Sequence, residues 1–335
     1  MLGVLAIRLR ERNFAGVPDS AREKLQIRLR AQYIFTLSMT AELFRILDDF
    51  SQCGIETLLV KGPLISLLAY NDPAVRSYVD LDLLVRHRNI LAATRRMVEM
   101  GFEPDVPVSA IEGGKIPGEY LFKRPGTTQI VELHTERTFR YYPRPMRLED
   151  LFARRRRVGL DGMEIPALSL EDEFVLNCIH GAKHFWERLM WVADIAAIVA
   201  RHPEMDWKLV RKSVRDVGAE RMLHVALQLA GTLLGVPVPA DMAEEVKQDT
   251  AAGKLCGQVA GWLPYAGYAP PTLTQRAVFR MGMRGGGVAG AAYLLRLSLS
   301  PTEEDWVEGG QGRRSWILDS VQRPLRLLKK YWSNE

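Results

Sequence analysis

The segment Tyr78-Val-Asp80-Leu-Asp82-Leu-Leu-Val85 has the pattern of a buried β-strand that carries two aspartates among aliphatic residues. Because side chains alternate across a strand, Asp80 and Asp82 are expected on one face. Neighbouring carboxylates repel each other and are costly to desolvate. A bound Mg²⁺ ion relieves both penalties, which favours metal-assisted phosphoryl or nucleotidyl transfer. An isolated Asp-x-Asp is more often an edge strand with a hydrated face, so the flanking segments decide the matter.

The upstream flank predicts a strand, a tight turn and a helix. Residues 55–60 are a short apolar run, Gly62 supplies the turn, and Pro63 occupies the first helical position. Such a turn brings backbone N–H groups and a helix N-terminus close to an anion. Lys61 adds a positive charge suited to phosphate, and Arg76 follows the helix just before the two aspartates.

The downstream flank predicts a β-hairpin over residues 118–134, with Pro125-Gly126 as its turn. Strand alternation places Glu132 and His134 on the same face of the second strand. Glu132 is therefore a candidate third carboxylate beside Asp80 and Asp82. The alternative is that Glu132 is a solvated cross-strand partner.

The ordered series of these segments resembles the poorly characterised bacterial nucleotidyltransferase-like family of the polymerase-beta superfamily. The resemblance covers roughly residues 40 to 240. It rests on these strings: Leu59-Val-Lys61-Gly62-Pro-Leu64, Tyr70-Asn-Asp72-Pro73-Ala-Val-Arg76, Asp80-Leu-Asp82-Leu-Leu-Val85, Val131-Glu132-Leu133-His134, His180-Gly-Ala-Lys183-His184 and Leu189-Met-Trp191-Val-Ala-Asp194-Ile195.

The resemblance implies an α+β fold and an Mg²⁺-dependent transfer reaction. In that superfamily the glycine turn meets the nucleotide triphosphate, here at Lys61 and Gly62. The carboxylates of Asp80, Asp82 and Glu132 are then the expected ligands of two Mg²⁺ ions, for which Mn²⁺ is expected to substitute. The residue after Gly62 departs from the family pattern, because proline has neither a hydroxyl nor an N–H group for phosphate. Lys61 and Arg76 are the expected substitutes.

A second group of polar residues follows the hairpin. His180, Lys183 and His184 share one face of a predicted helix. Lys183 is expected near phosphate, and His134, His180, His184 and Asp194 are expected to line the cleft or contact the acceptor. Zinc binding by the two histidines is disfavoured, because the glutamate of a zincin motif is absent. The open alternative is a polar contact between domains.

Three regions are predicted along the chain of 335 residues. Residues 1–53 form an N-terminal helical segment, residues 54–166 the nucleotidyltransferase-type mixed-sheet core with flanking helices, and residues 167–335 a mostly α-helical domain. A second hairpin is expected around Asp161-Gly162. The first long helix, near residues 20–52, is expected to bury Leu25, Leu29, Ile34, Leu37, Leu43 and Leu47.

Composition is that of an ordinary globular protein, with 47% hydrophobic and 25% charged residues. A net charge of +5 suits an anionic ligand without implying nucleic acid. Three dispersed cysteines argue against a disulfide framework and favour the cytoplasm. No run is long and apolar enough to be a transmembrane segment, and the N-terminus lacks the pattern of a secretory signal.

Two basic segments have no assigned role. Arg154 to Arg157 are expected to be a solvated connector between domains, the alternative being a patch for an acidic partner or nucleic acid. The basic amphipathic segment 323–332 is expected to dock on its own domain rather than on a membrane surface or a partner.

These features predict an Mg²⁺-dependent nucleotidyltransferase that uses an NTP, with ATP the expected donor. The acceptor is not identified by the sequence, and a small molecule or peptide is favoured over nucleic acid. Two alternatives stay open: a nucleotide-binding regulatory protein with weak catalysis, which the Gly62-Pro63 turn favours, and a small-molecule or peptide kinase.

Overall fold

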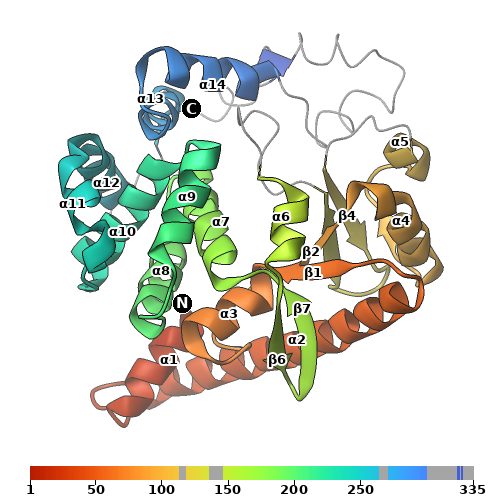
Figure 1. Ribbon diagram of the computed structural model, residues 1–335. Coiled ribbons are helices and arrows are strands. Elements are labelled where there is room, and N and C mark those ends of the chain that lie inside the picture. Colours follow the sequence, from red (N-terminus) through yellow and green to blue (C-terminus); the bar gives the residue numbers. More distant parts are fainter. Residues whose placement is uncertain (113–117, 136–145, 264–270, 300–322, 325, 327–335) are drawn as a thin grey trace. The chain divides into compact units, whose positions relative to one another are not determined.

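The computed structural model describes residues 1–112, 118–135, 146–263, 271–299, 323, 324 and 326 (Figure 1). The chain forms two compact units, each discontinuous in sequence. The first comprises Met1–Asp105, Tyr120–Thr135 and Phe152–Ser169, and the second comprises Val106–Glu119, Glu136–Leu151 and Leu170–Glu335. The predicted boundaries after residues 53 and 166 stay a prediction.

A seven-stranded mixed sheet is the centre of the first unit, and its strand order is β3-β4-β5-β2-β1-β7-β6. Strand β1 runs antiparallel to β2 and parallel to β7, while β5 runs parallel to β2. The strands are β1 (Thr57–Val60), β2 (Leu81–Val85), β3 (Glu103–Pro104), β4 (Glu119–Lys123), β5 (Ile130–His134), β6 (Arg156–Leu160) and β7 (Met163–Ala167). Together with the flanking helices, this sheet confirms the predicted α+β fold class.

Strands β1 and β2, which are neighbours in the middle of the sheet, are buried along their whole length. Helix α3 (Gly62–Tyr70) packs against both of them and carries Pro63 in its first turn, as predicted. It ends where Asn71 adopts a left-handed conformation with φ 58°. The predicted strand–turn–helix unit is therefore confirmed, and it sets the position of the turn beside β2.

Helix α2 (Asp19–Gln52) confirms the predicted long helix, but the predicted core positions were partly wrong. Ile34 and Leu37 are 61% and 44% exposed. Leu25 and Leu43 are buried as predicted, and the buried stripe follows Thr36, Met39, Leu43, Ile46 and Phe50. These positions recur every three or four residues, which is the spacing of one helical face. Choosing core residues by their apolar character alone therefore included residues from two different faces of the helix.

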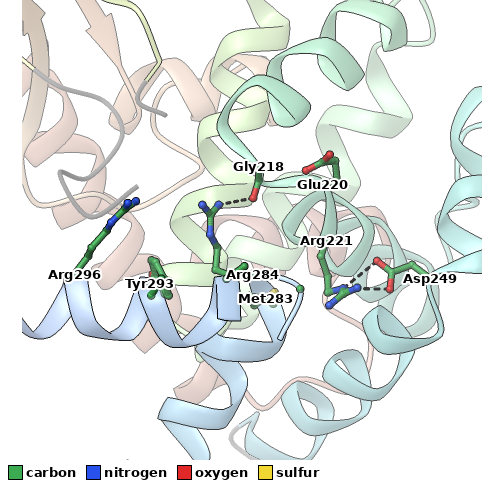
Figure 2. A pocket seen from close by; sticks show the side chains of 11 residues that line it. Gly218, Glu220, Arg221, Asp249, Met283, Arg284, Tyr293 and Arg296 are labelled. Carbon is green, nitrogen blue, oxygen red and sulfur yellow. Dashed lines mark hydrogen bonds and ion pairs between the residues drawn. The ribbon is translucent and has the colours of Figure 1, made fainter. Parts of the chain in front are cut away.

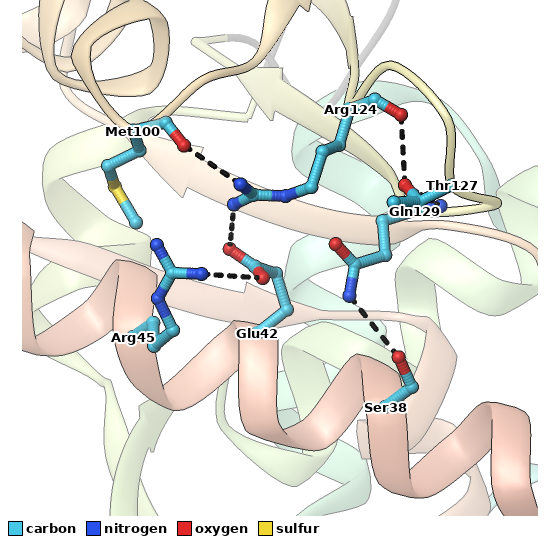
Figure 3. Close-up of polar contacts among 7 residues, drawn as sticks. All are labelled: Ser38, Glu42, Arg45, Met100, Arg124, Thr127 and Gln129. Carbon is cyan, nitrogen blue, oxygen red and sulfur yellow. Dashed lines mark hydrogen bonds and ion pairs between the residues drawn. The ribbon is translucent and has the colours of Figure 1, made fainter.

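A buried ion pair ties α2 to the β4–β5 hairpin (Figure 3). The carboxylate of Glu42, 4% exposed, accepts hydrogen bonds from Arg124 at 2.7 Å and from Arg45 at 3.3 Å. The Ser38 hydroxyl accepts a further bond from the Gln129 amide at 3.2 Å. Because Glu42 is buried, its two arginine partners offset part of the cost of desolvating its charge, and the Arg124 contact joins the hairpin to the helix.

The arginine run at residues 154–157, predicted as a solvated connector, is only partly a connector: Arg154 and Arg155 link α6 (Leu148–Ala153) to the next strand. Arg156 and Arg157 begin strand β6, which pairs antiparallel with β7 at the edge of the sheet. The predicted Asp161-Gly162 turn joins these strands, with φ values of 46° and 83°. Edge strands commonly carry basic residues that oppose pairing with other chains, which accounts for the charge of this segment.

The second unit is mainly helical. Helix α10 packs against α7, α8, α9, α11 and α12, and α13 packs against α7, α12 and α14. These helices are α7 (Leu170–Lys183), α8 (Leu189–Arg201), α9 (Trp207–Val217), α10 (Glu220–Leu234), α11 (Ala240–Gln248), α12 (Thr250–Trp262), α13 (Leu273–Met283) and α14 (Gly287–Leu299). Further helices of the described residues are α1 (Leu2–Glu11), a short 3₁₀ turn η1 (His87–Asn89), α4 (Ile90–Glu99), α5 (Val108–Glu112) and α6 (Leu148–Ala153).

None of the helices in the described ranges combines the length and the apolar character needed to cross a bilayer. Most of the basic segment 323–332, which was expected to dock on its own domain, lies outside the described residues.

Candidate functional site

Strand register brings the predicted carboxylates together. In the parallel β2–β5 ladder Asp82 is the direct partner of Glu132, and Leu84 is the partner of His134. Directly paired residues of adjacent strands project to the same face, so Asp82 and Glu132 lie side by side. On the other side of β2, Val60 is the strand partner of Asp82. Lys61 and the turn follow Val60 directly and therefore lie beside the carboxylates.

Four side chains from three segments meet at this point. The Asp82 Oδ1 atom lies 2.6 Å from Lys61 Nζ and 2.7 Å from His134 Nε2. The same imidazole nitrogen lies 3.2 Å from Glu132 Oε2. Asp82 and His134 are each 3% exposed at the side chain, and Glu132 is 18% exposed. The cluster is therefore buried at its base and reachable from solvent at Glu132.

Asp80 belongs to the same electrostatic cluster, although its predicted place inside the strand was wrong. Strand β2 begins at Leu81, and Asp80 sits in the bend before it, half-buried. Burial, and then the negative charges of Asp82 and Glu132, raise the pKa of Asp80 to about 6. The positive charges of Lys61 and His134 oppose this rise without cancelling it. Without a cation, the site therefore holds more negative charge than its own partners neutralise.

The turn between β1 and α3 is conformationally unusual. Lys61 has φ 51° and ψ −144°, a backbone region that side-chain-bearing residues rarely occupy. Gly62 has φ 36°, and a Cβ atom there would lie 3.4 Å from the Asp80 carbonyl oxygen. Glycine thus permits the turn to approach the carboxylate segment closely. The ion pair of Lys61 with Asp82 holds the strained residue in place.

The predicted phosphate ligand Arg76 is buried, 9% exposed. Its backbone N–H donates to the Ser66 hydroxyl oxygen at 3.0 Å, and that hydroxyl donates to the Asp72 carbonyl at 2.6 Å. These bonds fix the loop between α3 and β2. The contact of the Arg76 guanidinium with phosphate stays a prediction.

The residues predicted in the helical region form a group of their own within the second unit. The rings of His180 and His184 lie 4.6 Å apart, and both contact the Trp191 ring at 5.2 and 5.4 Å. Lys183 is half-buried at the end of α7, and Asp194 is buried in α8. Their predicted roles toward phosphate and acceptor stay predictions.

The donor set of the acid cluster fits a divalent cation. Within the described residues, one group of three or more potential metal ligands occurs, formed by Asp82, Glu132 and His134, whose ligand atoms lie within 4.8 Å of one another. Carboxylate oxygens suit both Mg²⁺ and Mn²⁺. A cation bound to Asp82 Oδ1 competes directly with Lys61 and His134, since both contact that oxygen.

Sequence reasoning placed His134 with the acceptor rather than among the carboxylates. Its spacing of two residues from Glu132 put both on one face, and that signal was sufficient to include it in the cluster. The Lys61–Asp82 ion pair had no such signal, because it depends on the strained backbone at Lys61.

A mixed sheet with carboxylates on adjacent strands, beside a strand–glycine turn–helix unit, defines a nucleotidyltransferase-type core. The sequence model of the family described as "Uncharacterised nucleotidyltransferase" matches residues 1–235, and the chain belongs to that family. The protein is accordingly a nucleotidyltransferase.

Similarity to other proteins is low. Among solved structures, the lincomycin-bound lincosamide antibiotic adenylyltransferase LnuA is similar at 15% identity and a TM-score of 0.31, over 40% of this chain and 83% of that chain. No curated protein matches the sequence.

Proposed function

We propose that this nucleotidyltransferase moves a nucleoside monophosphate from an NTP, with ATP the expected donor, to a small-molecule or peptide acceptor. Asp80, Asp82 and Glu132 are proposed to hold the Mg²⁺ ions, with Mn²⁺ able to substitute. One observation carries the proposal: carboxylates from two strand segments converge beside Lys61, at the turn where a triphosphate would meet the helix α3 N-terminus.

Bound divalent cations would polarise the α-phosphate and stabilise the pyrophosphate leaving group. The protein's own residues then have distinct tasks. Asp80, with its pKa of about 6, would give up its residual proton to hold a cation. His134 lies against both Asp82 and Glu132 and so orients their carboxylates toward a common centre.

Lys61 has a task that follows from competition at one oxygen. Its ammonium group occupies Asp82 Oδ1, an atom that a cation would also use. With a cation held by Asp82, Lys61 would be able to contact the triphosphate and help to neutralise its charge. Arg76 and Lys183 are proposed as further phosphate contacts. His180, His184 and Asp194 are proposed to contact the acceptor.

We also propose a cytoplasmic location. All three cysteines are unpaired, and Cys178 and Cys256 are buried as free thiols, which suits a reducing compartment.

The test uses NTPs labelled at either the α- or the γ-phosphate. The protein is incubated with Mg²⁺ or Mn²⁺, each of the four NTPs in turn, and pools of small-molecule and peptide acceptors. Label from the α-position should enter an acceptor with release of pyrophosphate, and Asp82→Asn should remove this transfer. Transfer of γ-label alone would identify a kinase, and nucleotide binding without transfer to any acceptor would favour a regulatory role.

A further inference from the structure

The helical unit contains a cavity of about 540 Å³ that the proposed transfer reaction does not use. It is lined by the turn between α9 and α10, the start of α12, the end of α13, and α14 (Figure 2). Its volume falls within the range that accommodates small organic ligands. Most of its wall lies beyond residue 235, where the family match ends.

The charged groups of the wall favour an anion. Arg221, Arg284 and Arg296 face two acids, Glu220 and Asp249. Asp249 already has partners within the protein. Its oxygens accept hydrogen bonds from Arg221 Nε at 3.2 Å and from the Ala252 amide at 3.1 Å. One of them also lies 2.9 Å from His224 Nδ1. Because Arg221 and Asp249 neutralise each other, the wall keeps two guanidinium groups, Arg284 and Arg296, and one carboxylate, Glu220.

Two of the arginines frame an aromatic ring. Arg284 donates to the carbonyls of Val217 and Gly218, which fixes its side chain, and its guanidinium carbon lies 5.5 Å from the Tyr293 ring centre. In Figure 2 Arg284 and Arg296 rise on either side of Tyr293. Arg296 is exposed, and within the described part of the chain it makes no ion pair. Tyr293 is buried, and this burial raises the pKa of its hydroxyl.

We propose that this cavity binds a small organic phosphate with an aromatic or apolar body. The phosphate would lie between Arg284 and Arg296, since guanidinium groups match its oxygens in geometry and its charge of nearly −2 requires more than one cation. The body would pack against Tyr293 and Met283. The site is separate from the acid cluster of the first unit and does not depend on the transfer reaction.

The test uses phenyl phosphate as the probe, with inorganic phosphate and benzoate as comparisons. Calorimetry on the full chain should show saturable binding of phenyl phosphate that is at least about tenfold tighter than that of either comparison. In protein labelled at the methionine methyl carbons, the Met283 signal, identified with Met283→Leu, should shift during the same titration.

Matched variants locate the binding. Arg296→Gln should weaken the phenyl phosphate complex by about tenfold or more, the loss expected for a charge-assisted contact. Arg201→Gln removes an equally exposed arginine at the end of α8, outside the cavity, and should leave affinity unchanged. Asp82→Asn should also leave affinity unchanged, which separates this site from the acid cluster.

The proposal is overturned if phenyl phosphate does not bind, or if Arg296→Gln and Arg201→Gln bind it equally well. It is also overturned if inorganic phosphate or benzoate binds as tightly as phenyl phosphate.

Discussion

Two aspartates of this protein, Asp80 in the sheet unit and Asp249 in the helical unit, have pKa values that are shifted in opposite directions. The pKa of Asp80 is raised to about 6 by burial and by the neighbouring carboxylates. Burial alone would also raise the pKa of Asp249, but hydrogen bonds from His224, the Ala252 amide and Arg221 outweigh it and lower that pKa.

The difference separates two uses of a buried carboxylate. Asp249 is fully satisfied by its own chain, so its charge stabilises the fold. Asp80 is placed among like charges, so its charge destabilises the fold unless something external compensates. Ionisable residues that reduce stability and cluster on neighbouring strands are typical of functional sites.

The largest effect is expected at Glu42, a buried carboxylate of the sheet unit that, like Asp249, is paired within the chain. Glu42 therefore tests whether the unfavourable charge of Asp80 is a property of the acid cluster rather than of every buried carboxylate in the sheet unit. Glu42→Gln leaves the half-buried Arg124 without its charged partner, so the free energy of unfolding should fall by about 3 kcal/mol, the low end for breaking a buried pair. Glu11→Gln, which breaks an exposed ion pair with Arg8, should change it by less than about 0.5 kcal/mol. Denaturant unfolding followed by circular dichroism measures both free energies. Equal effects of the two variants would show that the buried ion pair stabilises the fold no more than the exposed one.

Asp249→Asn should destabilise the helical unit by about 1.5–3 kcal/mol, because charged hydrogen bonds to Arg221 and His224 are lost. All seven tryptophans lie at residue 186 or later, in the second unit, so tryptophan fluorescence reports its unfolding. The cost should be present at neutral pH and shrink as pH falls from about 4, where the carboxylate of the unfolded chain takes up a proton, toward the lower pKa of the folded state. A pH-independent cost would contradict the charge-based account.

Asp80→Asn should have the opposite sign and a smaller size. It removes a repelled carboxylate, so the metal-free sheet unit should gain about 1–2 kcal/mol at pH 7. The gain should shrink as pH falls from about 6 toward 4, because the wild-type group then takes up a proton and loses its repulsion. Hydrogen exchange of peptides covering β2 measures it, and a destabilised variant would show that the Asp80 charge is satisfied within the chain.

Local sequence patterns predicted the sheet unit well. The apolar strands, the Gly62-Pro63 turn, the Pro125-Gly126 and Asp161-Gly162 turns and the alternation that pairs Glu132 with His134 are all short-range signals. The convergence of Asp82 and Glu132 needed more than these signals, because the β2–β5 register joins strands fifty residues apart in sequence. The family resemblance supplied that link.

The arginine cavity had no comparable signal. Its wall combines helix ends and turns from Gly218 to Arg296, and each residue alone looks like part of a solvated surface. Helix packing in the second unit, rather than any motif, brings these arginines together. The misplacement of Ile34 and Leu37 has a related cause, since which face of a long helix is buried depends on what packs against it.

The most direct test of the central claim, that the acid cluster is a cation site, is a titration of the protein with Mn²⁺ followed by electron paramagnetic resonance. Wild-type protein should bind Mn²⁺ saturably, and Mg²⁺ should displace it. Asp82→Asn should weaken binding by about a hundredfold, and Glu11→Gln should bind as the wild type does. Mn²⁺ binding that is equal in wild type and Asp82→Asn would contradict the assignment of the cluster as the metal site.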